Sequence, residues 1–310
     1  MNTLRWVAQK IGGAVVVLWL VATAIFAGIR LIPGDPAEAI MGGPGSQASA
    51  EALATARAEF GLDQPVLVQY LMFLGKLLQL DFGTSYSLKR PVFEVMAEVL
   101  PKTITLALLA LLVAWLLALC FCAVAMRVNR LGSWFGSVLE IVAAAVPHFW
   151  LGAVLIMLFS SALGWLPAVD NGTGAGLVLP VLTLALPLAG FLTQLMRDSL
   201  SAAMSSQFAL AARARGESRL TVFWRHGLRH ACLPALNLTG WAFSSLLSGA
   251  VVVEVIFARP GLGRSLLSAV LARDIPMVTG LALFSALVYI VVMAITEGIE
   301  RAIDPAGVAS

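Results

Sequence analysis

Six apolar blocks, each close to the length of a membrane span, constrain this chain more than any other feature. An α-helix needs about 20 apolar residues to cross the hydrocarbon core of a bilayer. A spanning segment must also satisfy its backbone hydrogen bonds internally, which favours helices. The sequence therefore predicts an all-α, polytopic membrane protein with six transmembrane helices. The blocks lie at about Ile11–Ile32, Thr103–Met126, Val138–Leu163, Leu177–Met196, Asn237–Phe257 and Val278–Glu297.

The composition agrees with this class. The chain is 60% apolar and only 12% charged, whereas a soluble domain has about 45–50% apolar and roughly 25% charged residues. The net charge of +3 is too small to indicate nucleic-acid binding. The three cysteines, Cys120, Cys122 and Cys232, have no metal-type spacing and are interpreted as small apolar fillers. The N-terminal apolar run continues through Ile32, so we expect a retained first helix rather than a cleaved signal peptide.

The distribution of Lys and Arg predicts the orientation. The loop from Arg197 to Leu236 holds six arginines, whereas the loop Gly164–Gly176 holds none and carries Asp170. Short loops rich in Lys and Arg stay in the cytoplasm. We therefore expect both termini to be cytoplasmic. One loop disagrees, because Ala258–Met277 should be external yet contains three arginines.

The chain is divided by these spans into an N-terminal first helix (1–32), a periplasmic insertion (33–102), a five-helix core (103–303) and a tail (304–310). The insertion is expected to be a small helical cap. Ser49 is placed as the cap of a helix reaching Phe60, and Pro65 starts another that reaches Leu80. A third helix is expected from Pro91 to near Leu100, after a turn at 81–85.

The polar segment Ser205–Pro234 separates two apolar blocks and is rich in Arg and His. Phe208, Ala211, Ala212 and Arg215 recur at helical spacing, and Gly216 is expected to end that helix. Leu233 and Pro234 are expected to end the unit. The segment thus predicts two short helices, bent at Gly216, that form a knob with a small-residue face and a basic rim. The alternative is an interfacial helix attracted to anionic lipid.

The sequence offers little sign of nucleotide binding or catalysis. The sequence has no Gly-x-x-x-x-Gly-Lys-Ser/Thr motif, so this chain is not expected to bind ATP by itself. No catalytic constellation is evident. His148, beside Pro147, is interpreted as a structural histidine at a helix kink, with its hydrogen-bonding groups paired. Glu254 is costly inside a span and supports an alternative hypothesis, a secondary transporter or channel that uses this carboxylate together with Glu297 and Glu300.

Several motifs in a fixed order resemble the ABC-importer permeases of the dipeptide, oligopeptide and nickel branch. The segment Ala211-Ala212-Arg213-Ala214-Arg215-Gly216, followed by His226, Arg229 and Leu233-Pro234, is similar to the coupling loop of that family. Further matches, which together cover nearly the whole chain, are Pro33–Pro36, Phe60–Pro65, Asp81–Ser85, Pro147–Leu151, Glu254–Arg264 and Arg273–Pro276. Glu217, His230 and Arg259 depart from the residues most usual at their positions.

The resemblance implies a type I importer permease in a bacterial inner membrane, itself without enzymatic activity or a bound cofactor. Its partners would be a second, homologous permease, two cytoplasmic ATPase subunits that bind ATP, an extracytoplasmic solute-binding protein and membrane lipid. The segment Ser205–Pro234 would dock on an ATPase. The implied solute is a peptide, glutathione, a nickel chelate or a metal–opine complex, with a slight preference for nickel-type solutes. Candidate pore or gate residues are Glu254, Arg259, Pro260, Gly261, Gly263 and Arg264.

Overall fold

The computed structural model describes residues 3–31, 37–38, 49–59, 61–125, 141 and 144–303. These residues are almost entirely helical, and the described part has no strand beyond one isolated bridge between Thr84 and Pro91. Five described helices are long and apolar enough to cross a membrane. They overlap the predicted first, second, fourth, fifth and sixth blocks over most of their length. The predicted third block begins among residues outside the described part, and its described portion is the shorter apolar helix His148–Ala162.

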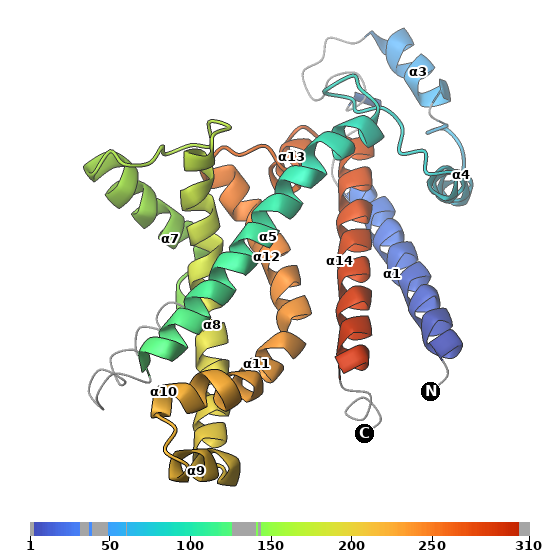
Figure 1. Ribbon diagram of the computed structural model, residues 1–310. Helices are drawn as coiled ribbons and strands as arrows, with labels where there is room; N and C mark the ends of the chain where they lie inside the picture. The colour runs from blue at the N-terminus through green and yellow to red at the C-terminus, as the bar shows by residue number, and fades with distance from the viewer. Residues whose placement is uncertain are drawn as a thin grey trace. The chain divides into compact units, whose positions relative to one another are not determined.

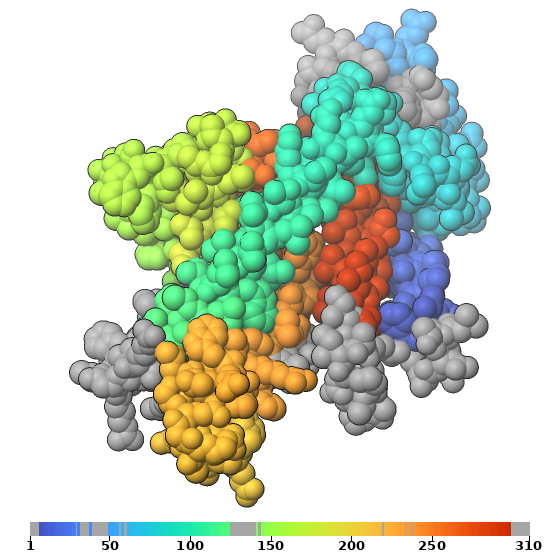
Figure 2. Space-filling model, in the orientation of Figure 1, coloured from blue at the N-terminus to red at the C-terminus, as the bar shows by residue number. Residues whose placement is uncertain are grey.

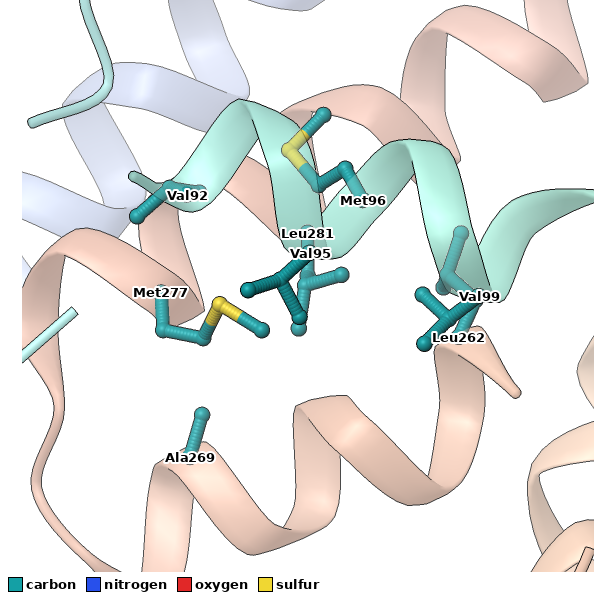
Figure 3. Packing of buried hydrophobic residues seen from close by; sticks show 8 residues of the cluster. All are labelled: Val92, Val95, Met96, Val99, Leu262, Ala269, Met277 and Leu281. Carbon is teal, nitrogen blue, oxygen red and sulfur yellow. The ribbon is translucent and has the colours of Figure 1, made fainter. Parts of the chain in front are cut away.

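The chain forms two compact units, and the first contains Met1–Lys102 and Pro260–Ala294. Its helices are α1 (Thr3–Leu31), α3 (Ala50–Glu59), α4 (Val66–Leu78), the start of α5 (Val92–Ala125), α13 (Leu262–Leu271) and most of α14 (Ile275–Ile303). Side chains of α5, α13 and α14 converge in its core (Figure 3). Gly280 of α14 lets the helices approach closely, because a Cβ there would lie only 2.5 Å from Cγ1 of Val92.

The short helices of the first unit begin largely as the sequence predicts. The amide of Ala52 donates to Oγ of Ser49 at 3.2 Å, which confirms Ser49 as the cap of α3. Pro65 is the N-cap of α4, where its missing N–H costs no helical hydrogen bond. The Oδ1 atom of Asp81 accepts from the amide of Gly83 at 2.9 Å and forms the expected turn.

The predicted end of a helix near Leu100 is wrong. Helix α5 runs without interruption from Val92 to Ala125 and contains Pro101. A proline inside a helix costs about 3 kcal/mol, but a complete break would leave several backbone groups unsatisfied in lipid. Buried Val99 and Leu106 on either side of the proline hold the helix together.

The second unit contains Thr103–Arg259 and Ile295–Ser310. After the rest of α5 come α7 (His148–Leu155), the π-helix η1 (Ile156–Ala162), α8 (Gly174–Ser205), α9 (Gln207–Ala214), α10 (Arg219–Val222), the π-helix η2 (Phe223–Gly227), α11 (Leu228–Asn237) and α12 (Thr239–Ile256), as Figure 1 shows. Helix α8 is central, since α7, α11 and α12 all pack on it. His148 opens α7 after the cap residue Pro147 and packs against Gly249 of α12.

Candidate functional site

The segment from Ser205 to Asn237 forms a small helical knob at one end of α8. Helix α9 ends at Ala214, and Gly216 follows with a φ of +89°, a conformation that disfavours any side chain. The amide of Glu217 then closes the turn by donating to the carbonyl of Ala212 at 3.2 Å. The predicted helix break at Gly216 is therefore confirmed, and the chain reverses into α10.

Helix α9 has a buried face and an exposed face. Ala209 and Ala212 are completely buried against Val222, with Met204 beside them. Ala211, Arg213, Ala214 and Arg215 are exposed. The expectation that Ala212 belongs to the surface offered to a partner is thus wrong, because this small side chain packs the inside of the knob. The exposed small residues are Ala211 and Ala214. Figure 2 shows the knob residues in gold and orange as a continuous projecting surface.

The second half of the knob packs on α8. A Cβ at Gly227 would lie 3.0 Å from Cδ1 of Leu200, so η2 approaches α8 closely. Arg229 is exposed, and His226 is half-buried. The prediction that Leu233-Pro234 ends the unit is wrong, because Pro234 lies inside α11, which continues to Asn237. The side chain of Leu233 lies outside the described part of the structure.

Contacts of Glu217, Phe208 and two histidines brace the knob around its bend. The Glu217 carboxylate lies 3.5 Å from Nη2 of Arg215 and 3.5 Å from Nε2 of His226. Phe208 of α9 stacks on the ring of His230, with centroids 5.0 Å apart, and contacts His226 at 6.5 Å. In the sequence, Glu217 and His230 stand out only because other residues are more usual at these two positions. Both lie after the bend: His230 packs on Phe208 of α9, and Glu217 contacts Arg215 at the end of α9.

Glu254 lies near the end of α12 and is fully buried. Its carboxylate accepts a hydrogen bond of 2.5 Å from the hydroxyl of Thr103, which is also buried. Partial hydration would make a carboxylate near the end of a span less costly, but this one is shielded from water. A hydrogen bond from a residue 151 positions away in the chain stabilises it instead.

Arg259 follows α12 and is almost fully buried. Its guanidinium forms an ion pair with Asp170 in the loop before α8. The amide of Asp170 donates to the carbonyl of Phe257 at 2.8 Å, and the amide of Arg259 donates to that of Glu254 at 2.9 Å. These contacts fasten the loop that precedes α8 to the end of α12. The sequence offered no signal for this partner of Arg259, because the two residues are 89 positions apart.

The remaining candidate gate residues lead into α13. Gly261 is its N-cap in an extended conformation, and Gly261 and Gly263 are buried, whereas Pro260 and Arg264 are exposed. Their proposed role at a pore mouth stays a prediction.

A second buried carboxylate, Asp274, lies at the start of α14 in the first unit. It accepts hydrogen bonds from the hydroxyls of Ser85 and Ser87 at 2.5 and 2.7 Å and from the amide of Ser87 at 3.0 Å. Burial alone would raise the pKa of Asp274, but the hydrogen bonds from Ser85 and Ser87 outweigh it and lower the pKa below its usual value. Burial and the charge of Asp274 raise the pKa of neighbouring Tyr86 to about 12.

Comparison with known proteins gives a consistent result over the whole chain. Residues 110–306 match the family described as binding-protein-dependent transport system inner membrane component, and residues 3–107 match the N-terminal family of such components. The chain is 36% identical to a protein of Brucella abortus (strain 2308) that carries a provisional name as a peptide transport system permease protein, with 96% of this chain and 97% of that protein covered. It is also 36% identical to the glutathione transport system permease protein GsiC of Salmonella paratyphi A, with 98% of each covered.

Two solved structures share the fold at low sequence identity. One is the MetNI methionine ABC transporter in an inward-facing conformation, with a TM-score of 0.56, 16% identity, and coverage of 68% of this chain and 96% of that chain. The other is an amino acid ABC transporter with histidines, with a TM-score of 0.53, 19% identity, and coverage of 68% and 94%.

Proposed function

Because the chain belongs to the family of binding-protein-dependent transport system inner membrane components, we propose that it is the permease subunit of an ATP-driven importer and forms half of a translocation pore. A second, homologous permease forms the other half. Two cytoplasmic ATPase subunits bind and hydrolyse ATP, and an extracytoplasmic binding protein delivers the solute. In this assembly the chain has six spans, and both termini are cytoplasmic. Residues 33–102 then form a periplasmic cap.

The knob at Ser205–Asn237 is the single observation that carries this proposal. Its exposed surface combines the small side chains of Ala211 and Ala214 with the charged rim of Arg213, Arg215 and Arg229. Small residues let a partner backbone approach closely, and charges at the rim guide association more than they add affinity. Such a surface suits docking in a groove of an ATPase subunit. Coupling would pass through the bend at Gly216.

We propose a peptide-type solute. The support is the relationship to permeases named for peptide and glutathione transport over nearly the entire chain. The slight initial preference for a nickel-type solute has no support of this kind.

Reconstitution tests the proposal. The chain is co-expressed with candidate ATPase, permease and binding-protein subunits, and uptake of labelled glutathione and dipeptides into vesicles is measured with and without ATP. We expect uptake only from the complete assembly with ATP and binding protein. Rapid uptake by this chain alone would refute the proposal and favour a secondary transporter or channel. The ligand that co-purifies with the binding protein identifies the solute.

A further inference from the structure

Helix α4 (Val66–Leu78) is apolar yet has no buried residue. Lys76 is its only charged side chain. Leu67, Leu71 and Leu78 are 69%, 59% and 87% exposed. These three residues share one face, because they are separated by four and seven positions in a helix with 3.6 residues per turn. A surface of this kind requires an apolar partner or an apolar solvent.

The opposite side of α4 is held against the C-terminal end of α1. The ring of Phe26 lies 5.0 Å from that of Tyr70 and 5.5 Å from that of Phe73, measured between centroids. The hydroxyl of Thr23 lies 2.7 Å from that of Tyr70. Thr23 donates its single proton to the carbonyl of Trp19 at 2.7 Å, so Tyr70 is the donor in this pair. Figure 1 shows α4 almost end-on beside the upper part of α1.

Gln69 fixes the rotation of α4 about its own axis. Its side-chain oxygen accepts a hydrogen bond from Arg30, and its side-chain nitrogen donates to the carbonyls of Leu62 at 3.0 Å and Gln64 at 2.8 Å. All hydrogens of this amide are used, so its orientation is determined. Gln69 therefore meets the very end of α1, whereas its neighbour Tyr70 meets Thr23.

These contacts indicate which face of α4 would point into a membrane that α1 spans. The apolar span of α1 extends from Trp6 to Gly28, so Thr23 lies within it and Arg30 lies beyond it. At 1.5 Å per residue, Thr23 is about 10 Å deeper than Arg30. Each residue of α4 turns the helix by about 100°. The side chain of Tyr70 therefore points deeper into the membrane than that of Gln69. The next residue, Leu71, points further toward the bilayer. Lys76, seven positions after Gln69, shares the outward side.

We propose that α4 is an interfacial helix that lies in the plane of the membrane and binds the acyl chains of the leaflet in which α1 ends. Leu67, Leu71 and Leu78 form its lipid-facing surface, and Gln69 and Lys76 face the headgroups and water. The occupant is lipid because the contacts with Thr23 and Phe26 place α4 at the depth of the last turns of a membrane span. Interfacial helices typically bury their apolar face about 5–10 Å below the headgroup boundary. The segment that follows α1 would thus be anchored to the bilayer by its own helix.

Site-directed spin labelling tests this proposal in the full-length chain. The three cysteines are replaced by Ala, and single cysteines are introduced as Leu71→Cys, Leu67→Cys or Lys76→Cys. All three positions are exposed, so labelling should not disturb the packing, and Lys76→Cys is the matched control on the same helix. The labelled protein, with any subunits that co-purify, is placed in nanodiscs of phosphatidylethanolamine and phosphatidylglycerol. Accessibility of each label to oxygen and to a water-soluble nickel complex is then measured.

We expect the labels at positions 67 and 71 to be more accessible to oxygen than to the nickel complex, with a depth parameter shifted toward the hydrocarbon relative to position 76. Equal access of the nickel complex to positions 71 and 76 would overturn the proposal, because both faces would then be in water. Immobile labels at 67 and 71 that neither reagent reaches would also overturn it, in favour of a protein partner. The result does not depend on transport activity, so it stands apart from the function proposed above.

Discussion

The Nε2 atom of His226 faces the Oε2 atom of Glu217 at 3.5 Å, and both atoms are buried without a hydrogen-bond partner in the described part of the chain. Glu217 directly follows the bend at Gly216, and His226 lies in η2 on the returning segment. Both residues therefore follow the bend, and their contact ties the turn after Gly216 to η2. Its strength should influence how firmly the exposed face of α9 is held.

Replacing Glu217 by Gln should loosen this brace and weaken docking of the ATPase subunit. A partly exposed polar contact of this kind contributes at most about 1 kcal/mol, so we expect the affinity to fall by up to about fivefold. His226→Gln should act in the same direction. Because both changes remove one interaction, the double variant should lose no more than the weaker-binding single variant. Binding of the purified ATPase to the permease in nanodiscs measures this, and additive losses would contradict a shared pair.

Gly216→Val should impair coupling without preventing membrane insertion. A non-glycine residue in this left-handed conformation costs about 1–3 kcal/mol, and the strain acts at the bend itself. Gly164→Val is the matched control, because Gly164 also has a positive φ and has no atom within 4 Å of the position its Cβ would take. We expect ATPase co-purification and transport-coupled hydrolysis to fall for Gly216→Val only. Wild-type values for both would show that the knob is a lipid-facing segment.

Asp274→Asn should destabilise the first unit. Hydrogen bonds to a charged group contribute about 1.5–3 kcal/mol, and Asn cannot accept from Ser85 and Ser87 as strongly. Asp63→Asn, at an exposed position, should leave the apparent melting temperature unchanged. The melting temperature of each variant in detergent at pH 7 tests this.

The lowered pKa of Asp274 also predicts a pH dependence. Because its folded-state pKa lies below the ordinary value of about 3.9, the carboxylate contributes stability above that pH. The contribution is lost as the pH falls through the lower, folded-state pKa. Asp274→Asn should therefore flatten the fall in stability below about pH 4. An unchanged acid profile in this variant would assign the fall to other carboxylates.

Glu254→Gln should slow transport or impair assembly while leaving the order of preferred solutes unchanged. The carboxylate is buried and bound to Thr103, so its role is to hold the end of α12 rather than to bind solute. Thr103→Val removes the same hydrogen bond from the other side and should have a similar effect. Competition between glutathione and a series of dipeptides in the uptake assay measures the order. A changed order in the Glu254 variant would identify the carboxylate as a solute ligand.

Local features of the fold could be predicted from the sequence, because their causes lie within a few residues of each other. The cap at Ser49, the start of α4 after Pro65 and the break at Gly216 follow from local backbone chemistry. Long apolar runs likewise identify α1, α8, α12 and α14. The continuity of α5 through Pro101 could not be predicted, because it depends on packing on both sides of the proline.

The candidate site was less accessible to sequence reasoning. Spacing places Ala211 and Ala212 on one helix but does not say which of them faces inward, since that depends on Val222 after the bend. The partners of Glu254, Arg259 and Asp274 lie 89 to 189 positions away in the chain. No local pattern encodes such pairings, and only the packed helices select them.

The close packing at Gly280 limits which glycines can be replaced to make this protein more stable. Exchanging glycine for alanine within a helix commonly gains about 0.4–1 kcal/mol. The same exchange is unobstructed at Gly12 and Gly13 of α1 and Gly75 of α4, where a methyl group would lie within 4 Å of no described atom outside its own stretch of helix. At Gly280 the same methyl group would collide with Val92 and force α14 away from α5. A stabilisation campaign should therefore exclude this position from its library and begin with the three unobstructed ones.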